Sequence, residues 1–287
     1  MGKLRVLVLG DGLLGSEIVK QTNWDCISRK GDGFDITDLE TYSLLTKVEF
    51  GSIQHCNYDV IINCIANTDT YNKNRDIHWD VNYLGVSNLI DFCNTWKIKL
   101  VHISTDYLYS NSDSEATENT VPVHCNNWYG YTKLLSDGLV QLSSKNYLLC
   151  RCTHKPTPFP YDNAWIDQVG NFDYCPNISK LIISMVTGNL SGLYNVGTET
   201  KTIYELASET RKVKKSYSPP HVPKNLSMNI NKLDTALNKP FFSIAIPTYG
   251  YGGRGAEFLE HSLIILNNQT FRDFEVVLSD HSEDDTI

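Results

Sequence analysis

Three residues in the first half of the chain have the types and the spacing needed to protonate an oxygen atom that is gaining negative charge. Tyr129 and Lys133 are four residues apart, so on a helix they share one face. A phenol has a pKa of about 10, and an ammonium on the same face should lower that pKa toward neutrality. Thr105 follows a strand-like segment, where it can hold a carbonyl oxygen. These residues predict reduction of a carbonyl group, with Tyr129 as the proton donor.

A glycine-rich turn near the start of the chain could hold the cofactor of such a reduction. Gly10, Gly12 and Gly15 stand in the segment GDGLLG, between a leucine- and valine-rich run and an amphipathic helix pattern. Backbone amides and a helix N-terminus at this place favour the pyrophosphate of a dinucleotide. Leu13 and Leu14 lie inside the same turn and are predicted to line the cofactor with it.

The residues after the second predicted strand indicate which dinucleotide is used. Ser28, Arg29 and Lys30 stand where an acidic residue would favour the ribose 2′-hydroxyl, whereas a cation can pair with a 2′-phosphate. The sequence therefore predicts NADPH, with NADH as the other candidate. Asp35 and Ile36 are predicted beside the adenine, because a carboxylate accepts from its amino group and an aliphatic side chain packs on its ring.

The elements that must position these residues alternate between strand and helix. Apolar runs at 60–66, 100–104 and 147–152 are predicted strands, and the stretches between them, such as 81–96, have a helical pattern. This order predicts an α/β fold of the Rossmann type, with a doubly wound parallel sheet in which the first strand pairs with 60–65.

Three parts are expected along the chain. Residues 1–150 form the predicted NAD(P)-binding Rossmann domain. In 151–240 the regular pattern gives way to Pro, Asn and aromatic residues, and we expect a small substrate-binding region there. Strand and helix patterns begin again in 241–287, as a partial βαβ unit.

Composition excludes several classes of function. A net charge of −8 and a pI near 5.5 give no general attraction for nucleic acid. No run of about 18 apolar residues predicts a membrane span, and no signal peptide precedes the first strand. The eight cysteines are scattered without zinc-site or disulfide spacing. We expect a cytoplasmic protein that holds no metal.

Taken together, several motifs resemble one enzyme family. The glycine turn, INCIANTD, HWDVNYLGV, STDY, YxxxK and LYNVGTETKTIYELA are similar to extended short-chain dehydrogenases that act on nucleotide sugars, especially the dTDP-4-dehydrorhamnose reductases. The resemblance covers residues 4–237. It implies that Thr105 holds the carbonyl oxygen, that Tyr129 donates the proton, and that Lys133 lowers the tyrosine pKa and binds the nicotinamide ribose.

The same resemblance implies further residues and a reaction. Ala66 and Asn67 would line the cofactor, and Asn82 would support the site. The implied activity is NAD(P)H-dependent reduction of a 4-keto-6-deoxy nucleotide sugar in deoxysugar and glycan biosynthesis. A nucleotide sugar is the expected partner, and a homodimer is left open.

The chain departs from the family pattern in two places, and related chemistries need to be weighed. Its GxGxxG turn is one residue shorter than the usual GxxGxxG, and the substrate region has no sugar-specific signature. Related dehydratases need an Asp-Glu pair as acid and base, but here Tyr107 follows Asp106, which argues against dehydration. An epimerase/reductase of the fucose-synthase type stays open through Cys152 and His154. A non-catalytic, dinucleotide-binding regulatory subunit is the remaining alternative.

Residues 241–287 resemble a different family. FSIAIPTYG and the later segment HSLIILNNQTFRDFEVVLSDHSEDDT are similar to the opening of family 2 inverting glycosyltransferases, of the glycosyltransferase A type. The resemblance implies that Thr248 lies at the nucleotide and that Asp280 helps hold the base or ribose. It also implies a fused transferase domain that continues beyond residue 287. The alternative is a closing βαβ unit of the reductase.

Overall fold

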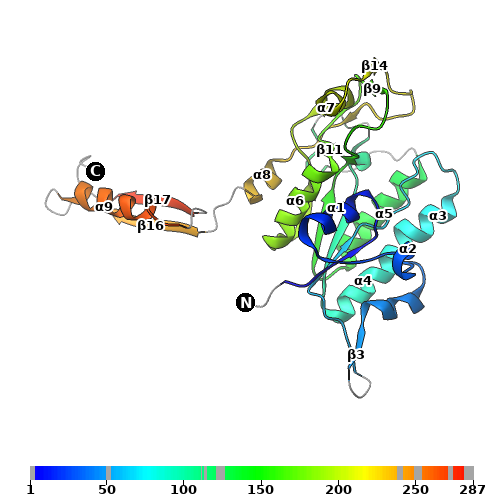
Figure 1. The fold of residues 1–287 in the computed structure, drawn as a ribbon, viewed down its shortest axis with the longest axis horizontal. Coiled ribbons are helices and arrows are strands. Elements are labelled where there is room, and N and C mark those ends of the chain that lie inside the picture. Colours follow the sequence, from blue (N-terminus) through cyan, green and yellow to red (C-terminus); the bar gives the residue numbers. More distant parts are fainter. Residues whose placement is uncertain are drawn as a thin grey trace. The chain divides into compact units, whose positions relative to one another are not determined.

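A computed structural model shows the chain as two compact units, Met1–Leu237 and Asn238–Ile287. The residues that it describes are 4–49, 53–110, 112, 115–120, 127–237, 242–248, 254–270 and 274–280. The first unit is built around a six-stranded parallel sheet with the strand order β12-β7-β6-β5-β1-β2 (Figure 1). Its strands are β1 (Val6–Leu9), β2 (Asp25–Ile27), β5 (Val60–Asn63), β6 (Lys99–Ser104), β7 (Tyr147–Arg151) and β12 (Gly192–Asn195).

The predicted pairing of the first strand is confirmed. β1 runs parallel to β5, with Val6 opposite Val60 and Leu9 opposite Asn63. The sequence pattern had suggested a longer strand, but β5 ends at Asn63, where the chain turns away to form the edge of the candidate site.

The sheet is covered on both faces because alternate residues of each strand point to opposite sides. Val6 and Val8 belong to one hydrophobic cluster, with residues of α1 and α6. Leu7 and Leu9 belong to another, with residues of α4. This division makes the fold a doubly wound, Rossmann-type α/β sheet. The helices of this unit are α1 (Leu13–Thr22), α2 (Arg29–Asp32), α3 (Arg75–Trp79), α4 (Gly85–Trp96), α5 (Trp128–Ser143), α6 (Cys175–Thr187), α7 (Ile203–Thr210) and α8 (Asn231–Leu237).

Short irregular helices connect several of these elements. A π-helical turn, η2 (Asp80–Leu84), joins α3 to α4, and 3-10 turns form η1 (Leu39–Leu45) and η3 (Asp106–Tyr109). A small hairpin of β3 (Lys47–Glu49) and β4 (Ile53–His55) stands apart from the main sheet. The turns η2 and η3 adjoin the predicted site, where irregular helical turns are often found.

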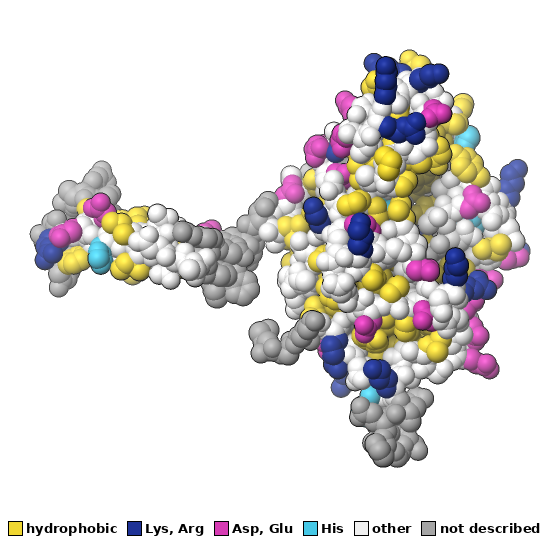
Figure 2. All heavy atoms as spheres, in the orientation of Figure 1, with side chains coloured by type: hydrophobic (Ala, Val, Ile, Leu, Met, Phe, Trp, Pro, Cys, Tyr) yellow, Lys and Arg dark blue, Asp and Glu magenta, His cyan; other side chains and the backbone are white. Residues whose placement is uncertain are grey.

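Apart from β12, the strands that follow β7 in the first unit are short. These strands form small two- and three-stranded sheets, in keeping with the loss of regular patterning in the sequence. Their bounds are β8 (His154–Lys155), β9 (Asn163–Trp165), β10 (Val169–Gly170), β11 (Asp173–Tyr174), β13 (Lys201–Thr202), β14 (Lys214–Ser216) and β15 (Asn225–Leu226). Figure 2 shows Lys and Arg side chains gathered over the end of this unit that carries α7 and β14.

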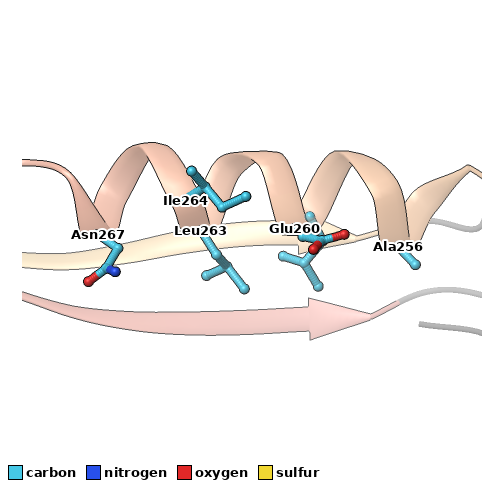
Figure 3. Close-up of a pocket in the computed structure, with 6 residues that line it drawn as sticks. Ala256, Glu260, Leu263, Ile264 and Asn267 are labelled. Carbon is cyan, nitrogen blue, oxygen red and sulfur yellow. The ribbon is translucent and has the colours of Figure 1, made fainter.

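The second unit is a βαβ arrangement. Strands β16 (Phe242–Thr248) and β17 (Phe274–Asp280) are parallel, and α9 (Gly255–Asn267) connects them. A pocket lies along α9, and Figure 3 shows Leu263 and Asn267 among the side chains that line it. Ile264 on the same helix is 52% exposed, so this unit leaves apolar surface uncovered within its described residues.

No helix in the described part of either unit has the length and apolar character to cross a membrane.

Candidate active site

The three glycines of the turn after β1 are needed for different physical reasons. The turn is also open on one side. Gly10 has φ +97°, a conformation that residues with a side chain rarely adopt. A Cβ on Gly15 would lie 2.0 Å from the carbonyl oxygen of Gly10, so Gly15 permits the close approach of helix and strand. Gly12 is the N-cap of α1, and a Cβ built there would meet nothing within 4 Å. The open space beside the helix N-terminus fits a dinucleotide pyrophosphate.

The two leucines of the turn lie in different environments. Leu14 is buried in the core beneath the sheet, whereas Leu13 is 46% exposed at the start of α1. Of these two leucines, only Leu13 therefore offers an accessible apolar surface beside Gly12.

The loop after β5 is held in place by one asparagine. The Asn67 amide donates to Asn82 Oδ1 at 2.8 Å, and Asn82 Nδ2 donates to the Asn67 carbonyl at 3.0 Å. The same Nδ2 donates to Thr132 Oγ1 at 3.2 Å, so Asn82 also ties this loop to α5. Ala66 and Asn67 thus follow the carboxyl end of β5 in a fixed position next to the helix of the predicted acid.

The residues predicted to choose the cofactor lie at the end of β2, beside the glycine turn. The Gly10 amide donates to the Ile27 carbonyl, which brings Ser28 next to the turn. Ser28 caps α2 by accepting from the Gly31 amide. The Arg29 side chain is 79% exposed and forms an ion pair with Asp35 at 3.2 Å. A cation is therefore available at this edge, although a carboxylate already accompanies it.

The two residues predicted beside the adenine differ in accessibility. Asp35 Oδ1 accepts from the amide and the hydroxyl of Thr37, and these bonds hold the pKa of Asp35 below its ordinary value despite its burial. Ile36 is buried in the core and would lie against a Cβ at Gly85. Its side chain presents little surface to a cofactor.

Thr105 and Tyr129 meet where β6 ends and α5 begins. Thr105 is buried and accepts from the Tyr107 amide at 3.2 Å, which starts η3. Asn127 caps α5 by accepting from the Gly130 amide at 2.7 Å, so Tyr129 stands in the first turn of that helix. The Thr105 hydroxyl acts to lower the pKa of Tyr129, so the two predicted side chains are neighbours.

The prediction that the pKa of Tyr129 is lowered toward neutrality was wrong. The pKa of Tyr129 is raised rather than lowered, because burial disfavours the phenolate, and the group that acts in the opposite direction is the Thr105 hydroxyl. Lys133 is on the expected helix, but its Nζ donates to the Ile103 carbonyl at 2.7 Å and lies 3.1 Å from His102 Nε2. The lysine is thus held by β6, and burial lowers its pKa to about 8.

The carboxyl group of Asp106, beside Thr105, was not among the predicted site residues. Asp106 is fully buried, its Oδ1 accepts from Thr153 Oγ1, and its Oδ2 has no hydrogen-bond partner in the described structure. Burial raises the pKa of Asp106, while the nearby Lys155 lowers it. His154 Nδ1 is also buried without a partner, and burial lowers the pKa of this imidazole to about 4.

A pattern in the sequence could have identified the polar residues at this edge of the sheet. Thr153, His154 and Lys155 follow the buried strand β7 after Cys152, at the same edge of the parallel sheet as Thr105. Three polar residues in that position are candidates for contact with a substrate.

A buried ion pair fixes α5, the helix that carries the predicted acid, against the sheet. Arg151 at the end of β7 donates through Nε to Asp137 on α5 at 2.7 Å, and both side chains are at most 5% exposed. Arg151 Nη1 also donates to the Tyr109 hydroxyl. Such a pair determines position more than it adds stability, because both charges have lost their water.

Known proteins resemble the chain in sequence and in fold. Residues 4–154 match the family described as the RmlD substrate binding domain. The spore coat polysaccharide biosynthesis protein SpsK of Bacillus subtilis is 24% identical over 213 residues, which are 67% of this chain and 72% of that protein. A dTDP-4-dehydrorhamnose reductase of Mycolicibacterium smegmatis is 32% identical over 121 residues, which are 40% of this chain and 33% of that protein.

Solved structures share the fold of the first unit. The dTDP-4-dehydrorhamnose reductase from Bacillus anthracis, solved in complex with NADP, has a TM-score of 0.67 at 21% identity and covers 81% of this chain and 92% of its own. The dTDP-glucose 4,6-dehydratase DesIV from Streptomyces venezuelae, in a double-mutant form with NAD and DAU bound, has a TM-score of 0.65 at 17% identity, covering 82% of this chain and 91% of its own. At these identities the likeness establishes the Rossmann-type fold.

Removing one partner of the buried ion pair should destabilise the first unit. Arg151→Met leaves the Asp137 carboxylate buried without its guanidinium, and the free energy of unfolding should fall by about 3–5 kcal/mol. Arg5→Met is the matched control, because Arg5 pairs with Asp59 at the surface and should change stability little. Urea unfolding followed by circular dichroism measures both. Equal losses in the two variants would show that the buried pair does not hold α5.

Proposed function

The chain belongs to the RmlD substrate binding domain family, and on that premise we propose that it reduces the 4-keto group of a 6-deoxy nucleotide sugar, with a nicotinamide dinucleotide as the hydride donor. The observation that carries the proposal is that Tyr129 lies beside Thr105 at the end of β6, while Lys133 on the same helix as Tyr129 is bonded to the Ile103 carbonyl of β6. The named reductases among its relatives and structural neighbours support the same reaction.

Each of the three side chains has a defined part in this reaction. A bound dinucleotide supplies hydride to the carbonyl carbon, and negative charge then develops on the carbonyl oxygen. The Tyr129 phenol, kept protonated by its raised pKa, gives its proton to that oxygen. The Thr105 hydroxyl is placed to hold the same oxygen, and Lys133 as an ammonium would favour the phenolate that remains.

NADPH is the proposed cofactor, and the glycine turn is its proposed site. The space beside Gly12 and the N-terminus of α1 suits the pyrophosphate, with Leu13, Ala66 and Asn67 beside it. The exposed Arg29 at the end of β2 favours a 2′-phosphate. The NADP in the Bacillus anthracis reductase supports NADPH, and the NAD in the DesIV structure keeps NADH as the second candidate.

The substrate is proposed to enter from the region after β7. Residues 1–150 would form the cofactor domain and 151–240 the substrate region, with the unpaired polar atoms of Asp106 and His154 between them. These atoms suit the hydroxyl groups of a sugar, because each is buried and has unused hydrogen-bonding capacity. The seven described cysteines are free thiols, which supports a cytoplasmic setting. A homodimer stays a prediction that sedimentation equilibrium would test.

The alternative chemistries have less support. An epimerase/reductase would need Cys152 and His154 to exchange protons, but burial raises the pKa of Cys152 to about 12 and keeps His154 neutral. A regulatory subunit would need no proton donor, and it would not oxidise NADPH in the presence of a 4-keto-6-deoxy nucleotide sugar. Tyr129, kept protonated beside Thr105, favours the enzyme.

For the second unit we propose the opening of a glycosyltransferase A-type domain that accepts a nucleotide sugar. Its parallel βαβ arrangement supports this reading, and so does the register that sets Thr248 directly opposite Asp280 at the ends of the two strands. A transferase joined to a sugar reductase could use the reductase's product.

Replacing the proton donor should reduce turnover. Tyr129→Phe removes only the acidic hydroxyl, so kcat should fall by about 10²- to 10⁴-fold while NADPH affinity changes little. Tyr131→Phe is the matched control, since Tyr131 lies two residues later on α5 with 44% exposure. NADPH oxidation is measured with a panel of 4-keto-6-deoxy nucleotide sugars. Near wild-type kcat for Tyr129→Phe would refute the assigned acid.

Reversing the charge at Arg29 should change the cofactor preference. In Arg29→Asp a carboxylate repels the 2′-phosphate, and NADPH affinity should fall by about 10- to 100-fold while NADH affinity holds or improves. Arg75→Asp makes the same change at an exposed position on α3 and should alter neither affinity. Fluorescence titration measures both cofactors. Equal NADPH affinities before and after the Arg29 change would mean that this side chain only faces solvent.

Nucleotide binding by the second unit can be tested separately. On addition of UDP or dTDP to the full chain, the amide resonances of Thr248 and Asp280 should shift, because both lie at the proposed nucleotide edge. Thr248→Ala should reduce the shift. Resonances that do not move with either nucleotide would contradict the transferase assignment without affecting the reductase.

A further inference from the structure

Three buried side chains form a line of contacts from β5 to α5. Asn63 Nδ2 lies 3.2 Å from His102 Nδ1, and His102 Nε2 lies 3.1 Å from Lys133 Nζ. Asn63 and His102 are 0% exposed and Lys133 is 1% exposed, so water does not reach the contacts. Each donor in this line must therefore meet an acceptor among the three side chains and the adjoining backbone.

The backbone decides the orientation of the asparagine. The Ile65 amide donates to Asn63 Oδ1 at 3.0 Å, and a backbone amide can only donate. Oδ1 is therefore the atom that faces Ile65, and Nδ2 is the atom that faces His102. An amide nitrogen only donates, so His102 Nδ1 must accept. The single proton of the neutral imidazole is then on Nε2.

This tautomer constrains the lysine. The Nε2 proton of His102 points at Lys133 Nζ, and an ammonium has no lone pair to accept it. A neutral amine accepts that proton and still donates to the Ile103 carbonyl. We infer that His102 favours the neutral amine of Lys133 over the ammonium when no cofactor is bound, and that His102 is a positioning residue for the proposed reduction. The inference rests on the proposed function only for its catalytic consequence.

The other groups around Lys133 agree with this assignment. From α5 it is faced by Asp137, and from the strand ends by Cys64 and Cys152 as well as His102. Among these groups, only Asp137 carries a charge that favours the ammonium. Its carboxylate is already bonded to Arg151, and burial outweighs it in lowering the pKa of Lys133.

The imidazole itself stays neutral. Burial lowers the pKa of His102 well below its ordinary value. A doubly protonated ring would also direct a proton at Asn63 Nδ2, which is a donor. His102 therefore contributes one fixed donor to Lys133 rather than a charge.

A consequence follows for cofactor binding. If the ribose hydroxyls are bound by the ammonium form, the fraction of Lys133 that is neutral must take a proton from solvent as the cofactor binds. Its pKa is then higher in the complex than in the free protein. Affinity is fully present below the free-protein pKa and decreases as pH rises through it.

The tautomer can be read directly. Full-length protein labelled with 15N-histidine and free of cofactor is examined by long-range 1H–15N correlation at a pH above the free-protein pKa of Lys133, and His102→Gln identifies the His102 signals by their loss. The inference expects the proton on Nε2. A proton on Nδ1 overturns it, whatever the enzyme's activity.

The effect on charge is read from NADPH affinity against pH. In His102→Gln the amide oxygen can turn to accept from the ammonium, so the midpoint of the alkaline loss should move up by about one pH unit. A merely structural role would weaken affinity at every pH without moving the midpoint, and an unmoved midpoint overturns the inference.

Lys133→Met separates this inference from the proposed function. The variant should bind NADPH more weakly and lose the pH dependence over this range. If it keeps wild-type affinity and the wild-type pH dependence, the proposed role of Lys133 at the cofactor fails, and the 15N spectrum still decides the tautomer.

Discussion

A lysine amine buried against the central sheet is the constraint on which the candidate site depends. Lys133 extends from α5 to the Ile103 carbonyl and to His102, both on β6, at a depth where water does not compensate a charge. A buried amine is stable only where acceptors and donors are already in place. The rigid parallel sheet provides them, and α5 must therefore keep one position.

Two further contacts keep α5 in that position. Asn82 bonds Thr132 and the loop after β5, and the Asp137–Arg151 pair ties the middle of the helix to the end of β7. Tyr129 lies at the N-terminal end of the same helix, beside Thr105. The acid and the lysine therefore keep one position relative to each other on α5, which suits a reaction that needs their mutual geometry preserved.

Local patterns predicted much of the fold and part of the site. The alternation of apolar runs and helical stretches predicted the parallel pairing of β1 with β5, because buried strands and amphipathic helices have different periods. The glycine turn and the Tyr-xxx-Lys spacing are also local. They placed Gly10, Gly15, Tyr129 and Lys133 on the elements where the structure has them.

Interactions between distant segments could not be predicted in the same way. The raised pKa of Tyr129 depends on how deeply α5 is buried, and the partners of Lys133 depend on which side of β6 faces that helix. The side chains of Asp106 and Thr153 come together only because β6 and β7 are neighbours in the sheet. Spacing along the chain carries no information on these contacts.

The central claim is that this site transfers hydride to a sugar ketone and protonates its oxygen. The most direct test is to incubate the full chain with a 4-keto-6-deoxy nucleotide sugar and NADPH carrying deuterium at the transferable position of C4. The account predicts a reduced 6-deoxy sugar nucleotide with one deuterium on its C4 carbon. Recovery of the keto sugar without deuterium, or a product labelled at another carbon, would contradict it.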